Sequence, residues 1–295
     1  MKILITGSNG LLGQKLVKLL VSEGIDVIAT SRGADRLGLN GYVYDPMDIT
    51  DANDVQTCIE RHTPDVVINT AAMTNVDQCE TEREACYALN VTAVAHLIAA
   101  CASVNCHLIH LSTDFIFDGS HGPLTEEDKP NPISYYGESK LVAEELLLKS
   151  NIKWSIARTV LVYGVAMDMS RSNIVLWVKK SLESGQQIKV VNDQWRTPTL
   201  AEDLAMGCYL IAKNKALGIF NISGEDMLTP YQMAMQTAEF FKLNSDLIEE
   251  TDGTKFTQTA KRPPKTGFII DKAKSELGYD PHGFAEGLQV LKDQL

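Results

Sequence analysis

The sequence predicts an α/β fold in which helices cover a parallel sheet. Three observations support this: short apolar runs rich in β-branched residues, longer runs of helical periodicity between them, and a glycine-rich turn after the first apolar run. Strands that alternate with such helices form a parallel sheet, because each helix carries the chain back to the same edge. The 295 residues leave room for a second, smaller lobe.

Residues 1–160 show this alternation most clearly. Strands are predicted at residues 2–6, 26–31, 42–44, 65–69, 107–112 and 154–158. Helices are predicted at residues 10–23, 51–62, 82–104 and 134–151. We therefore assign residues 1–162 mainly to the domain that contains the sheet.

The pattern is less regular after residue 163. Helices are predicted at residues 171–183, 200–212 and 230–241, strands at 188–191 and 218–222, and an irregular stretch around 261–264. We assign residues 163–295 mainly to a smaller substrate-binding lobe. Segments near 187–222 are expected to return to the main sheet.

The chain is acidic, with a formal net charge of -11 and an isoelectric point near 5.0. Such a charge repels polyanions at long range, so we expect neither nucleic acid nor an anionic membrane surface as a partner. The sequence contains no run of 18 apolar residues, so no membrane span is predicted. The oligomeric state stays open between a monomer and a homodimer.

The cysteines and histidines show no spacing typical of a special site. The six cysteines form no C-x-x-C pair, and the chain opens with a strand pattern instead of a signal peptide. We therefore expect a cytoplasmic location with buried, inert thiols. The six histidines form no H-E-x-x-H motif and no Cys/His cluster, so no metal site is predicted.

The turn after the first strand carries the G-x-x-G-x-x-G spacing of a dinucleotide-binding motif. It reads Thr6-Gly7-Ser8-Asn9-Gly10-Leu11-Leu12-Gly13. Gly7 allows a tight exit from the strand, Gly10 allows backbone to approach a pyrophosphate at the helix N-terminus, and Gly13 lets the helix lie close to the sheet. This context predicts a Rossmann-type fold, with cofactor contacts from Gly7, Asn9, Gly10, Leu11, Leu12 and Gly13.

The end of the second strand bears on the choice of cofactor. Ser31 and Arg32 stand where a chain that favours NAD usually carries an acid for the ribose hydroxyl. A guanidinium matches a 2′-phosphate, so NADPH is predicted, with NADH as the alternative. The other interpretation of Arg32 is a solvated surface residue. Asp48, followed by Ile49, is placed to meet the adenine edge or to cap a helix.

Tyr136 and Lys140 are predicted to handle protons. They are four residues apart at the start of the predicted helix 134–151 and so share one of its faces, whereas Tyr135 has Ser139 at that offset. An ammonium about 5–6 Å from a phenol is worth roughly 3 kcal/mol at an effective dielectric near 20, or about two pKa units. We therefore expect Lys140 to lower the pKa of Tyr136.

A hydroxyl at the end of the fifth strand completes the predicted site. Thr113 follows Ser112 at the carboxyl edge, where sheets of this kind place ligands, and is suited to donate to a carbonyl oxygen. The Y-x-x-x-K spacing alone is common by chance. Its order after a glycine turn and this hydroxyl predicts an NAD(P)-dependent oxidoreductase.

Three further stretches carry a family resemblance. They read Asn69-Thr70-Ala71-Ala72-Met73-Thr74-Asn75-Val76-Asp77, Ser112-Thr113-Asp114-Phe115-Ile116-Phe117-Asp118-Gly119, and Asn192-Asp193-Gln194 followed by Pro198-Thr199. With the motifs above, they resemble the extended short-chain dehydrogenase/reductase family over nearly the whole chain, and within it the dTDP-4-dehydrorhamnose reductases. The resemblance implies reduction of a nucleotide-linked 4-keto sugar by NADPH or NADH.

The resemblance also implies roles for individual residues. Thr113 and Tyr136 would hold the ketone oxygen, Tyr136 would donate the proton, and Lys140 would also bind the nicotinamide ribose. The residues implied near the sugar are Thr74, Val76 and Asp114, and those near the cofactor are Asn69, Ala71 and Ala72. Asn90 matches an asparagine that steadies the site, with an ordinary helical asparagine as the alternative. Arg262, with Arg196 second, is the basic candidate for the diphosphate, solvated charge being the alternative for both.

Two departures from the family pattern lie on the substrate side. The family's Arg-Thr-x-Trp-x-Tyr stretch has Leu161 in place of the aromatic residue expected against the sugar. The Gly-x-Pro-Thr element begins with Arg196, which removes a glycine and adds a charge. Both changes put the particular sugar in doubt.

Other functions remain open beside the reductase. Phe115 follows Asp114 where related dehydratases carry Glu, which disfavours dehydration, and no second acid/base pair typical of an epimerase is evident. The alternative from another class is a non-catalytic NADP-binding subunit that resembles the regulatory β subunit of methionine adenosyltransferase.

Overall fold

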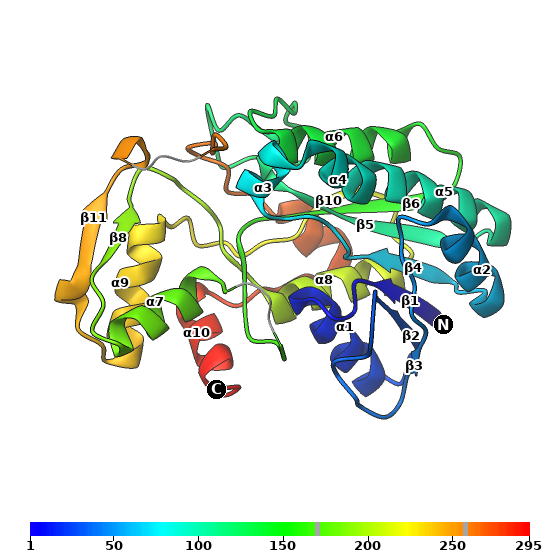
Figure 1. The fold of residues 1–295 in the computed structure, drawn as a ribbon, viewed down its shortest axis with the longest axis horizontal. Helices are drawn as coiled ribbons and strands as arrows, with labels where there is room; N and C mark the ends of the chain where they lie inside the picture. Colours follow the sequence, from blue (N-terminus) through cyan, green and yellow to red (C-terminus); the bar gives the residue numbers. More distant parts are fainter. Residues whose placement is uncertain (169–171, 256–258) are drawn as a thin grey trace.

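A seven-stranded sheet forms the centre of the computed structural model, which describes residues 1–168, 172–255 and 259–295 (Figure 1). Its strand order is β10-β6-β5-β4-β1-β2-β3, and all its pairings are parallel. The strands are β1 (Lys2–Thr6), β2 (Asp26–Thr30), β3 (Val43–Tyr44), β4 (Val66–Asn69), β5 (His107–Thr113), β6 (Lys153–Thr159) and β10 (Gly218–Asn221). The predicted α/β fold with a parallel sheet is confirmed.

Helices cover both faces of this sheet (Figure 1). One face carries α2 (Ala52–His62), α5 (Ala93–Val104) and α6 (Tyr135–Leu148), and the other carries α1 (Leu11–Ser22) and α8 (Ala201–Asn214). Alternate residues of a strand point to opposite faces, so Ile3 and Ile5 pack with α1 while Leu4 packs with α2 and α5. Because both faces are buried, β1 is apolar along most of its length.

The predicted helix 82–104 is one continuous helical run that changes its winding. It consists of α4 (Arg83–Tyr87), a π-turn at Ala88–Thr92, and α5. A short helix that the sequence did not indicate, α3 (Val76–Thr81), precedes it. Among the described residues, Arg83–Val104 is the one helix long and apolar enough to cross a membrane, and 44% of its apolar window is buried inside the protein.

The smaller lobe lies to the left in Figure 1. It contains α7 (Ile174–Glu183), β8 (Ile188–Val191), α9 (Pro230–Phe241), β11 (Ile248–Thr251) and α10 (Phe284–Lys292). The predicted helix 171–183 corresponds to α7, although Arg171 lies outside the described residues. The sequence did not predict β11 or α10.

Three strands in residues 187–222 pair in different sheets. β10 returns to the main sheet beside β6, but β8 pairs with β11 in a separate two-stranded sheet. β9 (Thr199–Leu200) pairs with β7 (Val162–Tyr163). The expectation that this region returns to the main sheet therefore applies to β10 and not to β8, whose buried side chains face α7 and α9 instead. A boundary at residue 162 stays a prediction.

The segment of residues 259–270, here called the C-terminal strap, runs back toward the carboxyl edge of the sheet. Trp195 N donates to Pro264 O at 2.7 Å, and Leu124 N donates to Gly267 O at 2.7 Å. These backbone bonds hold the strap between the loop after β5 and the loop before β9. The smaller lobe thereby reaches the predicted site.

Candidate active site

The predicted catalytic and cofactor residues meet at the carboxyl ends of the central strands. The glycine turn follows β1, Asn69 ends β4, and Thr113 ends β5. Because β4 lies between β1 and β5, these three ends are neighbours on one edge. The start of α6, which carries Tyr136 and Lys140, contacts the residues just after β5.

The glycine turn provides a close-packed cradle at the start of α1. Gly7 has a left-handed φ of +67°, and a Cβ on Gly13 would lie 2.3 Å from Gly7 O. Gly10 is the N-cap of α1, with no side-chain cap and no acidic residue in the first turn. The first backbone N–H groups of α1 therefore suit an anion, so the chain fits the pyrophosphate of a dinucleotide.

A methyl group at Gly13 is expected to disrupt this cradle. The added Cβ would lie 2.3 Å from Gly7 O and 2.6 Å from Ser8 Cα, and both are backbone atoms that cannot rotate away. We expect Gly13→Ala to weaken NADPH binding by tenfold or more and to cost about 1–3 kcal/mol of stability. Fluorescence titration with NADPH and urea unfolding would measure both effects.

Gly253→Ala is the matched control for Gly13→Ala. Its Cβ would meet only side-chain atoms, the nearest at 3.3 Å, and Gly253 belongs to the smaller lobe. NADPH binding should be unchanged in this variant. Equal binding by the Gly13 and Gly253 variants would contradict the role given to the cradle.

The side chain of Asn9 ties the glycine turn to the loop after β2. Its Nδ2 donates to Ala34 O at 2.9 Å and its Oδ1 accepts from Arg36 N at 3.0 Å. Arg36 Nη1 donates to Asp168 O at 2.9 Å, so this loop also contacts residues beyond β7. Sequence reasoning missed Arg36 because it stands outside any motif. Its place beside Asn9 adds a second arginine near Arg32.

The predicted adenosine contacts show mixed placements. Arg32 is exposed. Burial acts to raise the pKa of Asp48, but hydrogen bonds from Thr50 and the nearby charge of Arg32 outweigh it, so the pKa is lowered. Asp48 Oδ1 accepts from Thr50 N at 2.9 Å in a local turn. Asp51, not Asp48, caps α2. Ile49 is buried in the core between α2 and α5.

Tyr136 and Lys140 are both buried at the start of α6. Ser134 caps this helix by accepting from Gly137 N at 3.2 Å. Burial raises the pKa of Tyr136 above its ordinary value, although a hydrogen bond with Thr113 opposes the rise. The expectation that Lys140 lowers the phenol pKa is therefore wrong for the ligand-free protein, because removal from water outweighs any stabilisation of the phenolate.

Lys140 directs its amine to other partners. Nζ donates to Leu111 O at 2.6 Å and lies 3.0 Å from His110 Nε2. Burial lowers the pKa of Lys140 to about 8. His110 is a site residue that sequence reasoning missed. Residues three apart on a strand point to opposite faces, so the spacing of His110 from Thr113 did not indicate it.

Thr113 and Asp114 form a buried pair at the end of β5. Thr113 Oγ1 donates to Asp114 Oδ1 at 3.0 Å and accepts from Phe115 N at 3.2 Å. Thr266 of the C-terminal strap donates to Asp114 Oδ2, and Arg196 Nε lies 3.6 Å from the same oxygen. Burial raises the pKa of Asp114, against the opposing charge of Arg196. Asp114 is thus enclosed by protein groups and only 2% exposed.

The two basic candidates for the diphosphate are both engaged with protein. Arg196 is 4% exposed and donates to Pro263 O at 2.6 Å, so it is a buried anchor and the alternative of solvated charge is wrong for it. Arg262 forms an ion pair with Asp77, with Nη2 2.6 Å from Oδ2. That pair lies beside α3, near the residues implied for the sugar.

Asn90 links the predicted substrate loop to α6. It lies in the π-turn before α5, accepts from Met73 N at 2.8 Å and donates to Met73 O at 3.1 Å. It also donates to Ser139 Oγ at 3.0 Å. Within the loop that Asn90 holds, Ala71 and Ala72 are half-buried, Thr74 is exposed, and Val76 is buried at the start of α3.

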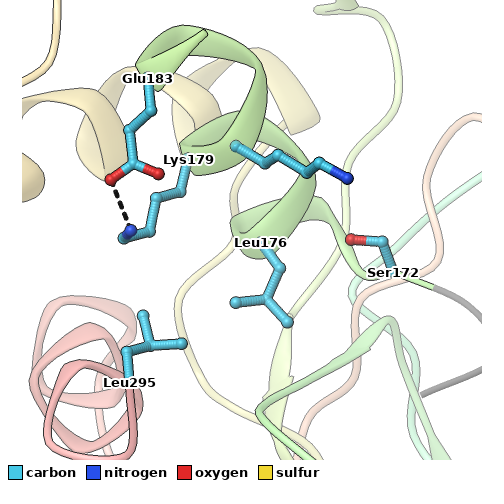
Figure 2. Close-up of a pocket in the computed structure, with 6 residues that line it drawn as sticks. Ser172, Leu176, Lys179, Glu183 and Leu295 are labelled. Atoms are coloured by element: carbon cyan, nitrogen blue, oxygen red, sulfur yellow. Dashed lines mark hydrogen bonds and ion pairs between the residues drawn. The ribbon is translucent and has the colours of Figure 1, made fainter. Parts of the chain in front are cut away.

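Two hollows in the surface lie at different places relative to this edge. Figure 2 shows a shallow hollow between α7 and the C-terminal Leu295, lined by Ser172, Leu176, Lys179, Lys180 and Glu183. A second hollow lies at the start of α6, beside the predicted site, and is lined in part by Glu80, Tyr135 and Lys261. The first hollow contains none of the predicted site residues.

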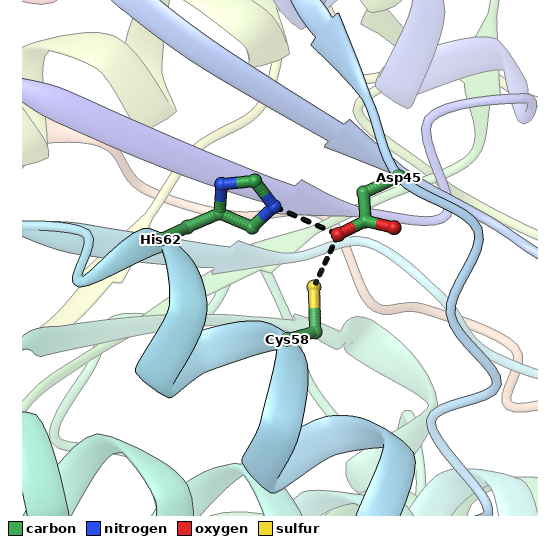
Figure 3. A group of neighbouring side chains, drawn as sticks. All are labelled: Asp45, Cys58 and His62. Carbon is green, nitrogen blue, oxygen red and sulfur yellow. Dashed lines mark hydrogen bonds and ion pairs between the residues drawn. The ribbon is translucent and has the colours of Figure 1, made fainter.

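One cluster has the residue types of a metal site (Figure 3). Ligand atoms of Asp45, Cys58 and His62 lie within 4.8 Å of one another. Arg61 Nη1 donates to the same carboxylate oxygen of Asp45 at 2.7 Å, and burial raises the pKa of the Cys58 thiol to about 12. A cation would meet a guanidinium and a neutral thiol there, so we assign the cluster to ion pairing.

Comparison with known proteins finds similarity along the whole chain. The family model described as RmlD substrate binding domain matches residues 1–295. A dTDP-4-dehydrorhamnose reductase from Aggregatibacter actinomycetemcomitans is 30% identical over 304 aligned residues, covering 99% of this chain and 98% of that protein. A crystal structure of dTDP-4-dehydrorhamnose reductase from Bacillus anthracis in complex with NADP has a TM-score of 0.89 at 25% identity, covering 100% and 99% of the two chains.

A relative with a different role is as similar in sequence. The methionine adenosyltransferase 2 subunit beta of Bos taurus is 30% identical over 249 residues, which covers 83% of this chain and 73% of that protein. Sequence similarity alone therefore does not separate a dTDP-4-dehydrorhamnose reductase from a methionine adenosyltransferase subunit.

Proposed function

Because the chain belongs to the RmlD substrate binding domain family, within the extended short-chain dehydrogenase/reductases, we propose that it is an NADPH-preferring reductase of a nucleotide-linked 4-keto-6-deoxy sugar. The favoured reaction converts dTDP-4-dehydro-L-rhamnose to dTDP-L-rhamnose. The observation that carries this proposal is the meeting of Thr113, Tyr136 and Lys140 beside the glycine turn at one edge of the sheet.

Tyr136 is protonated at neutral pH, as the reducing direction requires of a proton donor. A phenol whose pKa lies above its usual value stays protonated at neutral pH and is a donor to a forming alkoxide. Thr113, in contact with the phenol, is placed to share the same oxygen of the substrate. The bound NADPH would supply the hydride. Tyr136 and Thr113 would hold the ketone oxygen so that the proton arrives as negative charge develops.

The cofactor is assigned to the cradle formed by residues 7–13 and the strand ends around it. Backbone N–H groups of Leu11 and Leu12 would meet the pyrophosphate, and Asn69 with Ala71 would border the nicotinamide side. The NADP held by the Bacillus anthracis relative supports the choice of this cofactor. On the substrate side, Thr74, Val76 and the Arg262–Asp77 ion pair would meet the nucleotide sugar.

The second candidate function is a regulatory subunit that binds NADP without turnover. Asp114, implied near the sugar by family resemblance, is closed off by Arg196 and Thr266, and the bovine regulatory subunit is equally similar in sequence. An epimerase is the third candidate function. It would return the nicotinamide to its starting oxidation state after each turnover.

The test is NADPH oxidation at 340 nm by purified protein supplied with enzymatically generated dTDP-4-dehydro-β-L-rhamnose. Stoichiometric oxidation with formation of dTDP-L-rhamnose is expected. Tight NADPH binding without oxidation, with this sugar and with other nucleotide-linked keto sugars, would replace the proposal with the regulatory function. A changed sugar with no net NADPH loss would indicate an epimerase.

Arg32 is expected to set part of the preference for NADPH over NADH. It is exposed just after β2. A guanidinium–phosphate contact contributes about 1.5–3 kcal/mol, so Arg32→Asp should reduce the ratio of kcat/KM for NADPH over NADH by about ten- to a hundredfold. Arg36→Ala is the companion variant, because Arg36 shares the loop. An unchanged ratio in Arg32→Asp would make this arginine a bystander.

A further inference from the structure

A buried histidine connects Lys140 to the middle of the sheet. His110 is 1% exposed, and its Nδ1 lies 3.0 Å from Asn69 Nδ2 while its Nε2 lies 3.0 Å from Lys140 Nζ. Asn69 in turn accepts from Thr6 Oγ1 at 2.6 Å through Oδ1. A row of four polar side chains therefore runs from β1 through β4 and β5 to α6.

The hydrogen-bonding capacity of these groups decides where the imidazole proton lies. An amide NH2 donates and cannot accept, so His110 Nδ1 accepts when Asn69 Nδ2 faces it. Burial and the nearby Lys140 lower the pKa of His110 well below 6.5, so the ring is neutral and its one proton lies on Nε2. Nε2–H then donates to Lys140 Nζ, which accepts only as a neutral amine.

A second arrangement fits a charged Lys140. An ammonium has donors and no acceptor, so it needs a lone pair on His110 Nε2 in addition to Leu111 O. The imidazole proton then lies on Nδ1, and Asn69 turns its amide so that Oδ1 accepts that proton. In both arrangements His110 keeps a partner on each ring nitrogen.

We propose that His110 is a positioning residue that holds the Lys140 amine and changes its tautomer whenever Lys140 gains or loses a proton. A protonated Lys140 requires the Nδ1–H form of the ring, and a neutral Lys140 requires the Nε2–H form. Lys140 is a catalytic residue only if the proposed function holds, whereas the coupling is a property of the ligand-free protein.

The groups around Lys140 place this change of tautomer near pH 8. Burial lowers the pKa of Lys140 to about 8, and Glu144 from the same helix and Cys86 from α4 act in the opposite direction. Glu144 is bound by Arg158 of β6, with 2.7 Å between Nη2 and Oε2. The charge of Lys140 is present below this pKa and lost above it, so the tautomer should change near pH 8.

Nitrogen-15 NMR of the histidine rings tests the tautomer directly in the protein without ligands. His110 should be in the Nδ1–H form below about pH 7 and in the Nε2–H form above about pH 9, following the Lys140 pKa of about 8. His110→Gln identifies the resonance by its absence. In Lys140→Met the tautomer should not vary with pH. A single tautomer from pH 6 to 10 in the unaltered protein overturns the proposal.

Two amide variants separate the two ring nitrogens. His110→Gln carries its amide about as far as Nε2 and keeps a partner for Lys140, whereas His110→Asn reaches only the position of Nδ1 and keeps a partner for Asn69. Without the second acceptor at the position of His110 Nε2, the ammonium of Lys140 is disfavoured. We expect His110→Asn to lower kcat about tenfold and to move the alkaline limb of kcat/KM down by about one pH unit.

The kcat of His110→Gln should stay within about threefold of that of the unaltered protein at every pH. Equal losses in both variants, with the alkaline limb unmoved, would mean that His110 only fills space and would overturn the proposal. If neither the variants nor the unaltered protein reduces the keto sugar, the proposed function fails. The NMR result still decides whether His110 and Lys140 are coupled.

Discussion

Replacing Tyr136 by Phe should reduce kcat for keto-sugar reduction by about a thousandfold, since general acid catalysis by a positioned side chain contributes about 10²–10⁴. The phenyl ring keeps the edge contact with Phe115, whose ring centroid is 5.8 Å away, so the packing around it should survive. Affinity for NADPH should change by less than about threefold. Single-turnover fluorescence at saturating NADPH would isolate the chemical step.

Tyr135→Phe is the control for this prediction. Tyr135 is the preceding residue on α6, its backbone N–H donates to Glu80 at 2.7 Å, and its ring lies 4.7 Å from the Arg83 guanidinium. Loss of its hydroxyl should change kcat by less than about twofold. Full activity in Tyr136→Phe would refute the assigned proton donor, because its phenol would then have no part in the transition state.

Removing the positive charge of Arg158 should destabilise the protein by about 3–5 kcal/mol. Arg158 and Glu144 are 3% and 1% exposed and make a two-pronged contact, with 3.0 Å from Nε to Oε1 and 2.7 Å from Nη2 to Oε2. Arg158→Met keeps the apolar stem but leaves a buried carboxylate without its partner. Urea unfolding followed by circular dichroism would show the midpoint shift.

The double variant Arg158→Met/Glu144→Leu separates charge from shape. Replacing both members of a buried ion pair by apolar side chains is often close to neutral, so most of the lost stability should return. Because Glu144 also helps keep Lys140 protonated, the double variant should lose activity at a lower pH than the unaltered protein. A double variant as unstable as Arg158→Met would contradict the electrostatic explanation.

Local rules predicted the central sheet and the placement of Tyr136 and Lys140 at the start of one helix, because the information lies within short stretches. The strand-glycine-helix order at residues 2–22 and the four-residue spacing of Tyr136 and Lys140 depend on backbone geometry that each segment carries itself. The same rules missed α3, β11 and α10. These elements are short or depend on partners distant in sequence, as β11 depends on β8.

The charge state of the site could not be predicted from spacing. The distance argument for Tyr136 and Lys140 treated both as partly solvated, but the fold buries them almost completely. Removal from water then changes the pKa of each group more than the other group does. In the same way, the sequence left Arg196 open between a diphosphate ligand and a solvated charge, whereas the strap places the backbone carbonyls of Pro263 and Pro264 around it.

Asp114 also has a consequence for the order of events during synthesis. Its partner Thr266 follows it by 152 residues, a length that takes a ribosome roughly 8–30 s to add at about 5–20 residues per second. Until then, the carboxyl edge of the nascent sheet holds a carboxylate that is still open to water. A chain released at residue 162 would carry Tyr136 and Lys140 but would lack Thr266, which covers Asp114. Such a fragment should therefore depend on chaperones, whereas the full-length chain would close this edge as its last segments emerge.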